Sequence, residues 1–581
     1  MNIVLINPYC LDPRLQDYDI KVPPIGLYYI GASLIDAGHH CTILNLYDKQ
    51  AQHDTIEHII GSHQPDLIGI SILHANRWGG LDIAKISKKI LPSIPVVFGG
   101  PGAIFLWHHL LTHFPEVDYI VLDEGERPMV QMADLLSEGK VDQFSQVPGV
   151  AFRDGDRLSK NAPQPFLEDL DSLPDPSTYF RFQHVISSRG CPWNCAFCGS
   201  PRIWKRRVRF HSPQYFVDQL ERLHKAGINF FYVSDDTFTL DKQRVIEICK
   251  LILKKDLGIT WAAISRVNHV DEQILYWMRR AGCMQISYGV ESGSPKIRKI
   301  LNKKLSNGQI KKAFELTSSF GLMPRAYFIY GCPGDNNKTI NETIRLMERI
   351  RPLGAIFYIL DIFPGTALYD DFKKRTGLDD DIWLKRIEDI MYFETDPSLS
   401  QQAVLDFGKR LRKAFYRALP KFADLLTLVD QKELYPLHAD FLSRLAMTFA
   451  FGDYSHIKDI PNPKGIAERL FNRALDYHPD HRAYLGLGML LQRKNRHKEV
   501  IELLERGLEH FPEDPDLLIC YGLSLMNTGM PEKALEIFMS QSSNVQALEY
   551  ARYCARILGR NELLRPLTKQ IESLSGDKEA R

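Results

Sequence analysis

Short apolar segments alternate with helical patterns over the first 145 residues of this 581-residue chain. The apolar segments have the length of strands, and segments between them, such as 26–37 and 81–90, repeat their apolar residues with a helical period. Gly38 stands where a helix would end. The alternation predicts a parallel, doubly wound α/β sheet with strands at 3–7, 41–45, 67–72, 96–98 and 119–122.

The carboxyl ends of these strands carry small or turn-forming residues. They are Asn7-Pro8-Tyr9, Ser71, Gly99-Gly100-Pro101-Gly102 and Asp123-Glu124-Gly125-Glu126. Ligands of doubly wound sheets bind at such ends, where glycines let a large flat ligand approach the backbone. Ordinary glycines of strand–helix loops are the alternative interpretation.

The alternation restarts at His184 and gives six further strand–helix units. Ser212-Pro213, Asp241, Asp271 and Ser294-Pro295 are expected helix caps. Six units are too few for an eight-unit barrel, so we expect a partial (β/α)6 barrel with its active face at the carboxyl ends of the strands. These strands are expected at 184–188, 228–233, 259–264, 285–289, 325–330 and 356–362.

Cys191, Cys195 and Cys198 follow the first of these strands on one short loop. Three thiolates so closely spaced can each bind a different iron of a cubane cluster, which leaves the fourth iron without a protein ligand. A structural zinc site is the alternative, but zinc would need a fourth ligand and usually a second closely spaced pair. The spacing therefore indicates an iron–sulfur cluster with one open iron.

Charge and cysteine content narrow the class of protein. The chain has 72 Lys and Arg against 71 Asp and Glu, so no bulk charge favours nucleic acid or an anionic membrane as its partner. Seven cysteines scattered around one tight triplet are typical of a reducing compartment. A strand-like run follows Met1 in place of a signal peptide, and no apolar stretch is long enough for a transmembrane segment. We expect a cytoplasmic protein.

The remaining segments suggest a linker and helices. Residues 148–180 are rich in Pro and Asp and are expected to form an extended linker between domains at 1–147 and 181–398. A helical connector is expected at 399–462. In 463–581, Gly488 and Gly522 stand 34 residues apart, as do Asn495 and Gly529, a period that resembles tetratricopeptide repeats. Such an all-α domain either binds a protein or peptide or stabilises the rest of the chain.

Over about residues 1–400 the chain resembles the radical SAM superfamily, in particular the branch with an N-terminal cobalamin-binding domain. The most specific match is Cys191-x-x-x-Cys195-x-x-Cys198, with the aromatic Phe197 beside the last cysteine. The other matches are Ser234-Asp235-Asp236, Gly289-Val290-Glu291-Ser292-Gly293, Gly331-Cys332-Pro333-Gly334, Pro23-Pro24-Ile25-Gly26, Gly99-Gly100-Pro101 and Glu124-Gly125-Glu126.

The resemblance implies a Rossmann-like cobalamin-binding domain followed by a radical SAM barrel. It implies that the three cysteines hold a 4Fe–4S cluster whose open iron chelates S-adenosylmethionine. An external donor such as flavodoxin or ferredoxin would reduce the cluster, and cleavage of S-adenosylmethionine would release a 5′-deoxyadenosyl radical that abstracts a substrate hydrogen.

Site residues follow from the matching positions. Glu291 matches the family position that contacts S-adenosylmethionine, and Gly289 and Ser292 match more loosely. Arg266 is expected to pair with the carboxylate of that cofactor. Asp235 and Asp236 are expected to reach ribose hydroxyls or substrate. The alternatives are an ion pair between Glu291 and Arg266 and a helix-capping role for the two aspartates. Cys283 and Cys332 are expected to be buried packing residues, with a thiyl or covalent role in catalysis as the alternative.

The expected cobalamin contacts come from the N-terminal matches. His58-Ile59-Ile60-Gly61 is similar to the His-x-x-Gly that ligates cobalt in other cobalamin domains, but Ile56 replaces the required Asp and the segment is predicted to be helical. Cobalt is therefore expected to receive no histidine from this motif. The expected contacts are Tyr9, Pro24, Gly26, Ser71, Gly99, Gly100, Glu124, Gly125 and Glu126.

The resemblance implies a cobalamin-dependent radical SAM methyltransferase that acts on an unactivated carbon. Radical cyclisation, rearrangement or carbon–carbon coupling, with cobalamin in another role or absent, is the alternative. A methylthiotransferase acting on transfer RNA is less favoured, because it would need three N-terminal cluster cysteines where this chain has Cys10 and Cys41. A non-catalytic tetratricopeptide scaffold is a further alternative. The substrate, whether small molecule, lipid or peptide, is not indicated.

Overall fold

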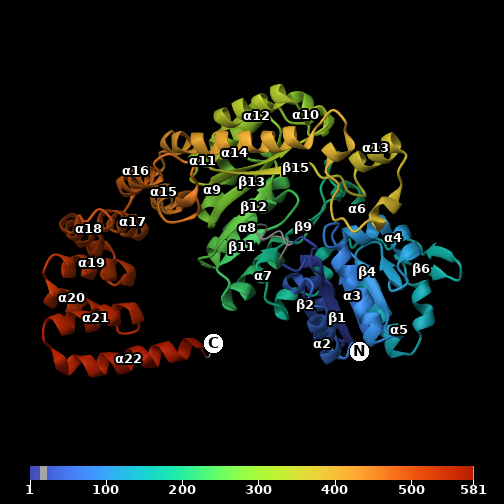
Figure 1. The fold of residues 1–581 in the computed structure, drawn as a ribbon, viewed down its shortest axis with the longest axis horizontal. Coiled ribbons are helices and arrows are strands. Elements are labelled where there is room, and N and C mark those ends of the chain that lie inside the picture. Colours follow the sequence, from blue (N-terminus) through green and yellow to red (C-terminus); the bar gives the residue numbers. More distant parts are fainter. Residues whose placement is uncertain (13–21, 580–581) are drawn as a thin grey trace. The chain divides into compact units, whose positions relative to one another are not determined.

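The computed structural model describes residues 1–12 and 22–579, and its contacts divide the chain into two compact units (Figure 1). The first unit comprises residues 1–313, 325–347 and 355–411, and the second comprises 314–324, 348–354 and 412–581. Both α/β domains expected from the sequence thus lie largely in the first unit, and the expected helical segments lie largely in the second.

A seven-stranded sheet forms the N-terminal part of the first unit. Five of its strands are parallel and lie in the order β2-β1-β3-β4-β5, so the predicted doubly wound sheet is confirmed. The order changes direction between β1 and β3, the kind of position where such sheets form a ligand crevice. The elements are β1 (Asn2–Asn7), α1 (Ile25–Asp36), β2 (His40–Asn45), α2 (His53–His63), β3 (Leu67–Ser71), α3 (Arg77–Ile90), β4 (Val96–Gly99), α4 (Pro101–His113), β5 (Tyr119–Val121) and α5 (Glu126–Ser137).

Part of the predicted linker is an antiparallel hairpin that extends this sheet. β6 (Val150–Asp154) pairs with β5, and β7 (Arg157–Lys160) pairs with β6. Gly155 lies in the turn with φ 57°, a conformation that glycine adopts readily. The prediction of an extended linker over 148–180 was wrong for these residues. The buried Val150 and Ala151 give this short hairpin its place against the sheet.

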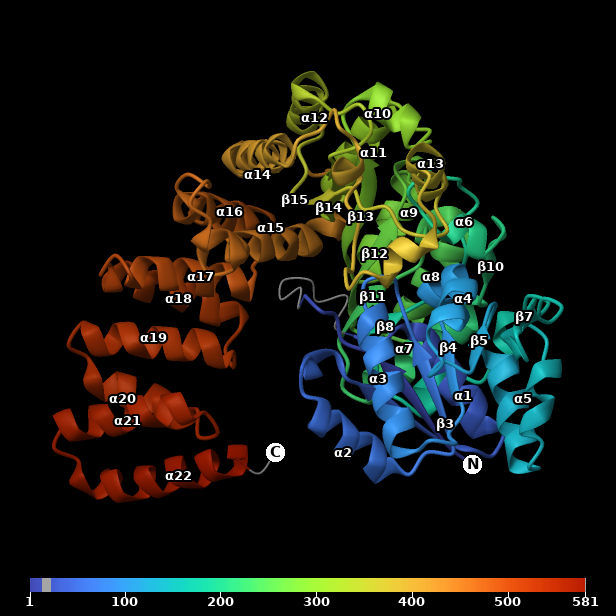
Figure 2. The ribbon, with the colours of Figure 1, turned by 45° about the vertical axis from the view of Figure 1, so that its right-hand side comes forward.

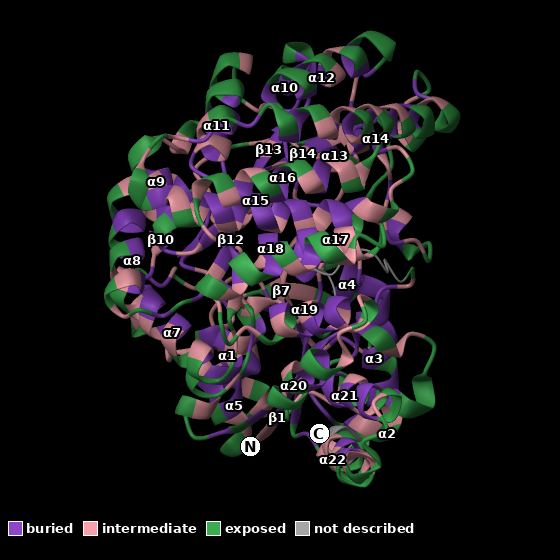
Figure 3. Ribbon diagram, turned by 90° about the vertical axis from the view of Figure 1, so that its left-hand side faces the viewer, coloured by how far each residue is buried: buried purple, intermediate pink, exposed green. Residues whose placement is uncertain are grey.

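A six-stranded sheet follows in the order β15-β14-β13-β12-β11-β8, which confirms the predicted partial barrel. The pairs β8–β11, β11–β12 and β12–β13 are parallel. The helices α8 and α9 carry buried residues on one side and exposed residues on the other (Figure 3). The elements are β8 (His184–Val185), α7 (Pro213–Lys225), β11 (Phe230–Val233), α8 (Lys242–Lys254), β12 (Thr260–Ser265), α9 (Glu272–Arg280), β13 (Cys283–Glu291), α10 (Pro295–Ile300), α11 (Asn307–Ser319), β14 (Met323–Tyr330), α12 (Asn337–Ile350) and β15 (Gly354–Ile359).

Helix caps fix where the barrel helices begin. The side chains of Ser212, Asp241 and Asp271 each accept a backbone N–H three residues later, at the starts of α7, α8 and α9. Gly227 and Gly282 have φ near 89° just after α7 and α9. The caps at Ser212, Asp241 and Asp271 were expected from the sequence. Ser294, the fourth expected cap, makes no side-chain capping bond at the start of α10.

The second unit consists mainly of helices that pack in chain order (Figures 1 and 2). Consecutive helices from α15 to α22 contact each other, and α17 and α19 each also contact the helix two positions earlier in the chain. No helix in the described part of the chain is long and apolar enough to span a membrane. The helices are α14 (Gln401–Asp424), which begins in the first unit, α15 (Tyr435–Ala450), α16 (Pro463–Tyr477), α17 (His481–Gln492), α18 (His497–His510), α19 (Pro515–Asn527), α20 (Pro531–Ser540), α21 (Val545–Ile557) and α22 (Asn561–Glu579).

Candidate active site

The three predicted cluster ligands lie on one loop between β9 (Ser188–Arg189) and α6 (Ser200–Ile203). Cys191, Cys195 and Cys198 are free thiols, each partly exposed. Burial raises the pKa of the Cys198 thiol to about 12, so iron must displace the proton to obtain a thiolate ligand. Three free thiols on one open loop fit a cubane cluster with one iron left for another ligand.

Asp235 holds the chain that leads into this loop. Its Oδ1 accepts the backbone N–H groups of Ser187 and Ser188 at 2.6 and 3.2 Å, and its Oδ2 accepts both serine hydroxyls at 2.6 and 2.7 Å. The carboxylate is buried and satisfied by these four bonds. The expectation that Asp235 reaches ribose or substrate is therefore wrong, because the protein itself uses all four bonds.

Asp236 points to a different environment. It accepts a hydrogen bond of 2.7 Å from the hydroxyl of Ser200, two residues after Cys198. Burial, together with the charge of Asp235, raises the pKa of Asp236. The side chain lines a cavity beside the cysteine loop, so its placement agrees with a contact to a bound molecule.

Glu291 pairs with Lys303 instead of Arg266. Its Oε1 lies 2.7 Å from the Lys303 Nζ; Glu291 is buried, and Lys303 is partly buried. A Cβ at Gly289 would lie 2.5 Å from Oε1 of Glu291 and 2.7 Å from the same Nζ, so glycine makes room for this ion pair. Ser292 is buried and accepts the N–H of Ser294. Sequence reasoning missed Lys303, which no motif identifies.

Arg266 lies against the cysteine loop. Its guanidinium stacks on the indole of Trp193, 4.1 Å from the ring centre, and its Nη1 lies 3.9 Å from Sγ of Cys195. The group also donates to the carbonyl of Lys304. The alternative of an ion pair between Arg266 and Glu291 is not found, and the guanidinium is held where a cluster-bound carboxylate could meet it.

A cavity of about 330 Å³ lies beyond the carboxyl ends of β3, β4 and β5. Its walls are mostly apolar, and Ile186, Arg189, Ile203 and Trp204 close it from the side of the barrel. None of the described residues that line it is a histidine. Eight of the nine predicted cobalamin contacts line it: Pro24, Gly26, Ser71, Gly99, Gly100, Glu124, Gly125 and Glu126.

The glycines of this cavity serve two purposes. A Cβ at Gly26 or Gly99 would meet no atom within 4 Å, so both leave open space inside the cavity. Gly100 instead has φ 84°, and a Cβ there would lie 2.8 Å from the carbonyl oxygen of Ile72. An apolar slot bordered by bare backbone fits a large flat cofactor such as cobalamin.

Tyr9 does not belong to this group. Its side chain is buried, and its hydroxyl donates to Oδ2 of Asp82 at 2.9 Å. Burial and the Asp82 charge raise the pKa of Tyr9. A Cβ on Gly79 of α3 would lie 2.0 Å from the Tyr9 carbonyl oxygen, so the chain after β1 packs on α3 and away from the cavity. The prediction that Tyr9 contacts cobalamin was wrong.

Two glutamates of the cavity bind arginines from the barrel. Arg189 Nη1 lies 2.7 Å from Glu124 and Nη2 lies 2.6 Å from Glu126, and Arg209 lies 2.8 Å from Glu124. All four side chains are buried. Burial favours a raised pKa for Glu124, but the hydrogen bond from Arg209 and the charge of Arg189 outweigh it, so the pKa is lowered. Sequence reasoning missed both arginines, although Arg189 stands two residues before Cys191.

A second cavity, of about 400 Å³, adjoins the first. Gly199, Ser200 and Asp236 line it on the side of the cysteine loop. Leu73, Pro101, Ile203 and Trp204 line both cavities, so these four residues, here called the shared wall, lie between them. A molecule in the second cavity would therefore border both the residues that follow Cys198 and the wall of the first cavity.

Family models match both halves of the first unit. A model of the radical SAM superfamily matches residues 185–347, and a model of the B12 binding domain matches residues 15–133. The chain is 31% identical over 382 residues to an uncharacterized methyltransferase of Pyrococcus horikoshii, a match that covers 64% of this chain and 83% of the relative.

Two further proteins extend the comparison. The chain is 26% identical over 380 residues to the anaerobic magnesium-protoporphyrin IX monomethyl ester cyclase of Cereibacter sphaeroides, covering 62% of this chain and 61% of the cyclase. The fold of this chain is similar to that of the radical S-adenosylmethionine methyltransferase TsrM from Kitasatospora setae. The TM-score is 0.55, and the identity is 17% over 64% of this chain and 76% of TsrM.

Proposed function

This chain belongs to the cobalamin-binding branch of the radical SAM superfamily, and we propose that it methylates an unactivated carbon of its substrate. The enzyme uses a 4Fe–4S cluster, S-adenosylmethionine and cobalamin. When bound, the cluster and S-adenosylmethionine supply a hydrogen-abstracting radical and cobalamin supplies the methyl group.

The shared wall is the observation that carries this proposal. A substrate in the second cavity would have the cysteine loop on one side and, across Leu73, Pro101, Ile203 and Trp204, the cobalamin cavity on the other. Methyl transfer after hydrogen abstraction needs both reagents within reach of one carbon, since a reacting pair must be held close and aligned. The apolar walls would exclude water from that carbon.

We propose roles for the chain's own groups on this basis. Cys191, Cys195 and Cys198 would hold the cluster, and Arg266, fixed on Trp193, would bind the carboxylate of S-adenosylmethionine. Glu291, held by Lys303, and Gly289 would border the same cofactor. Asp236 would hydrogen-bond the substrate, with Ser200 keeping its carboxylate in place.

Labelled S-adenosylmethionine tests the reaction type. The reduced holoenzyme would be incubated with a metabolite and lipid extract and with S-adenosylmethionine that carries a deuterated methyl group. A product that gains the labelled methyl group supports methylation. Formation of 5′-deoxyadenosine with a product of unchanged carbon count would contradict it and favour cyclisation, which the similarity to the magnesium-protoporphyrin cyclase supports as the second candidate.

We further propose a reducing, cytoplasmic setting and two partners. All ten cysteines are free, as a reducing compartment requires. A flavodoxin or ferredoxin would reduce the cluster, and adding each with its reductase should start formation of 5′-deoxyadenosine.

Residues 463–581 would form a tetratricopeptide-like domain that binds a protein or peptide, since its helices pack in chain order as in helical repeats.

A further inference from the structure

A cluster of two histidines and one aspartate lies apart from the proposed active site. His109 and His113 are one turn apart on α4, and Asp381 belongs to the short helix η8 (Asp380–Leu384). Oδ1 of Asp381 lies 3.0 Å from Nε2 of His113 and 3.5 Å from Nδ1 of His109. One ligand atom from each residue lies within 4.8 Å of the others.

His109 is the unusual member of this cluster. It is 3% exposed, and neither ring nitrogen makes a hydrogen bond with the part of the chain that the structure describes. His211 is equally buried, but its two ring nitrogens face Asp171 at 3.0 Å and the Tyr29 hydroxyl at 3.1 Å. Buried polar groups in folded proteins normally make hydrogen bonds, so the lack of a hydrogen bond at both ring nitrogens of His109 requires an explanation.

The chemistry of the three groups suits a divalent transition metal. Two histidines four residues apart on one helix, together with one carboxylate, are a common donor set for zinc. The carboxylate of Asp381 is 58% exposed and the ring of His113 is 29% exposed, so a water could complete the coordination. Asp380 and Asp381 place negative charges near His109. Arg77 and, when it is protonated, His113 place positive charges there.

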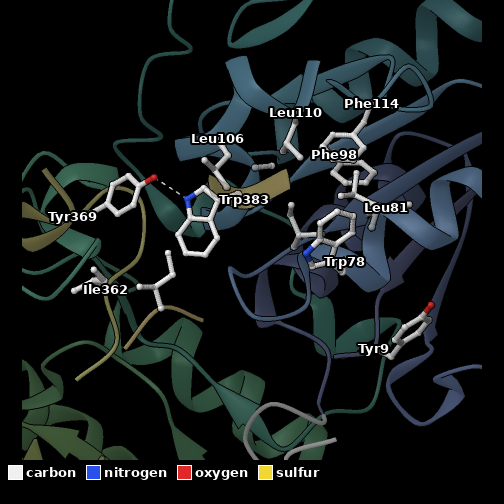
Figure 4. Close-up of a cluster of buried hydrophobic side chains, with 14 of the residues drawn as sticks. Tyr9, Trp78, Leu81, Phe98, Leu106, Leu110, Phe114, Ile362, Tyr369 and Trp383 are labelled. Atoms are coloured by element: carbon white, nitrogen blue, oxygen red, sulfur yellow. Dashed lines mark hydrogen bonds between the residues drawn. The ribbon is translucent and has the colours of Figure 1, made fainter. Parts of the chain in front are cut away.

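We propose that His109, His113 and Asp381 bind a divalent transition metal ion, zinc above all, which clips α4 to η8. The two elements already contact each other, and Trp383 of η8 belongs to the same buried cluster as Leu106 and Leu110 of α4 (Figure 4). Its indole donates to the hydroxyl of Tyr369 at 2.8 Å.

The clip would act on both cavities through α4. This helix begins at Pro101, which belongs to the shared wall, and Gly100 just before it lines the first cavity. A metal at the other end of α4 would fix the helix relative to the chain after β15. The role is structural and does not depend on the proposed methyl transfer.

Zinc titration of the holoenzyme tests the proposal. The cluster must be loaded first so that Cys191, Cys195 and Cys198 do not take up zinc. We expect one zinc ion per chain, and X-ray absorption at the zinc edge should show imidazole nitrogen and carboxylate oxygen without sulfur. His113→Ala and Asp381→Asn alter partly exposed side chains, so both should fold while zinc affinity falls at least about tenfold.

His108→Ala is the matched control, because His108 is an exposed histidine on the same helix. It should bind zinc like the unaltered enzyme. Zinc should also raise the melting temperature of the unaltered enzyme and the control but not of His113→Ala. Absence of zinc binding, equal binding by all variants, or sulfur ligation would overturn the proposal and leave the His113–Asp381 hydrogen bond as the sole role of the pair.

Discussion

Arg189 joins the cysteine loop to the wall of the first cavity through two buried ion pairs. Its guanidinium binds Glu124, in the loop after β5, and Glu126, the first residue of α5, while its backbone leads directly into Gly190 and Cys191. Removing one partner of a buried pair leaves a charge without compensation, which usually costs more than the pair contributes in net stability. The arginine therefore governs how firmly the two cofactor regions are held together.

Arg189→Met should lower the free energy of unfolding by about 3–5 kcal/mol. Chemical denaturation, followed by fluorescence of the tryptophans, measures this change. Arg207→Met is the matched control: its partner Glu168 is 2.7 Å away, but both side chains are at least half exposed. That substitution should cost at most about 1 kcal/mol. Equal losses in the two variants would show that Arg189 is not held as a buried pair.

Glu124 makes stability depend on pH in the acid range. Its pKa is lowered in the folded protein, so its contribution is fully present above the ordinary glutamate pKa of 4.5 and is lost as pH falls through the lower, folded value. Denaturation of the cluster-free protein at several pH values should show Glu124→Gln less stable than the unaltered chain at pH 7. The difference should shrink below about pH 4.5. A constant difference would contradict the lowered pKa.

Cys195→Ala should abolish iron binding at the triplet and with it the formation of 5′-deoxyadenosine. Iron analysis after anaerobic reconstitution, together with the cluster absorbance, measures the effect. Cys283→Ala serves as the control, since Cys283 is buried in β13 and its thiol contacts the carbonyl of Gln285. This variant should keep its cluster. Normal iron content in Cys195→Ala would refute the assignment of the loop.

Some site residues could be predicted from sequence and others could not. Spacing alone brings Cys191, Cys195 and Cys198 onto one loop, and chain order brings the strand-end glycines to one edge. The spacing of residues along the sequence does not predict which distant residue a side chain will bind. Asp235 meets serines 47 and 48 residues away, and Glu124 meets Arg189 65 residues away. The Asp235 contacts form only when β8 and β11 pair, and the Glu124–Arg189 contact forms only when the two α/β domains of the first unit pack.

At the scale of elements, the turn from β4 into α4 shapes the first cavity. Gly99 ends β4 beside open space, and Gly100 adopts a left-handed conformation against the backbone of Ile72. Neighbouring glycines thus carry different constraints: Gly99 keeps volume free for a ligand, whereas Gly100 permits the fold of the turn.

Gly100→Ala should therefore destabilise the protein by about 1–3 kcal/mol, because a side chain would be forced into a positive φ and toward the Ile72 carbonyl. Gly99→Leu should leave stability nearly unchanged while it lowers cobalamin affinity, since its side chain would enter open space in the cavity. Thermal unfolding and equilibrium binding of cobalamin measure the two effects. The reverse pattern would contradict the cavity assignment.

The strands and helices of the first unit were largely predictable because their apolar periodicity and caps are strong. The β6–β7 hairpin was not, since Pro and Asp on both sides of it obscure two short strands. Its pairing depends on β5, whose free edge becomes available only when the parallel sheet has formed.

At the scale of the whole chain, the helices of the second unit pack mainly on their neighbours in sequence. In such arrays each helix pair depends on the adjacent pairs and hardly on distant ones. The sequence period predicted an all-helical region, and helices α16 to α22 follow one another from Pro463 to Glu579. The sequence predicted that the C-terminal helical domain begins at residue 463. The second unit instead comprises 314–324, 348–354 and 412–581. The difference arises because contacts between residues far apart in the sequence decide the division.

A chain that ends after Glu513 should keep its cluster and form 5′-deoxyadenosine at a rate within about twofold of the full chain. The deletion removes α19 to α22, which belong to the second unit, and leaves the first unit intact. Circular dichroism should show the loss of helix, and quenched assays should measure 5′-deoxyadenosine. Loss of the cluster in the shortened chain would show that these helices support the first unit directly.

The shared wall has an evolutionary consequence. Leu73 lies in the loop after β3, Pro101 begins α4, and Ile203 and Trp204 lie at the end of α6, and none of them is among the cysteines or the ion pairs that hold the cofactor regions. Mutations in this wall can alter which molecules fit while the inherited radical chemistry persists. Descendants of one ancestral enzyme could thus acquire new substrates through a handful of changes at this partition.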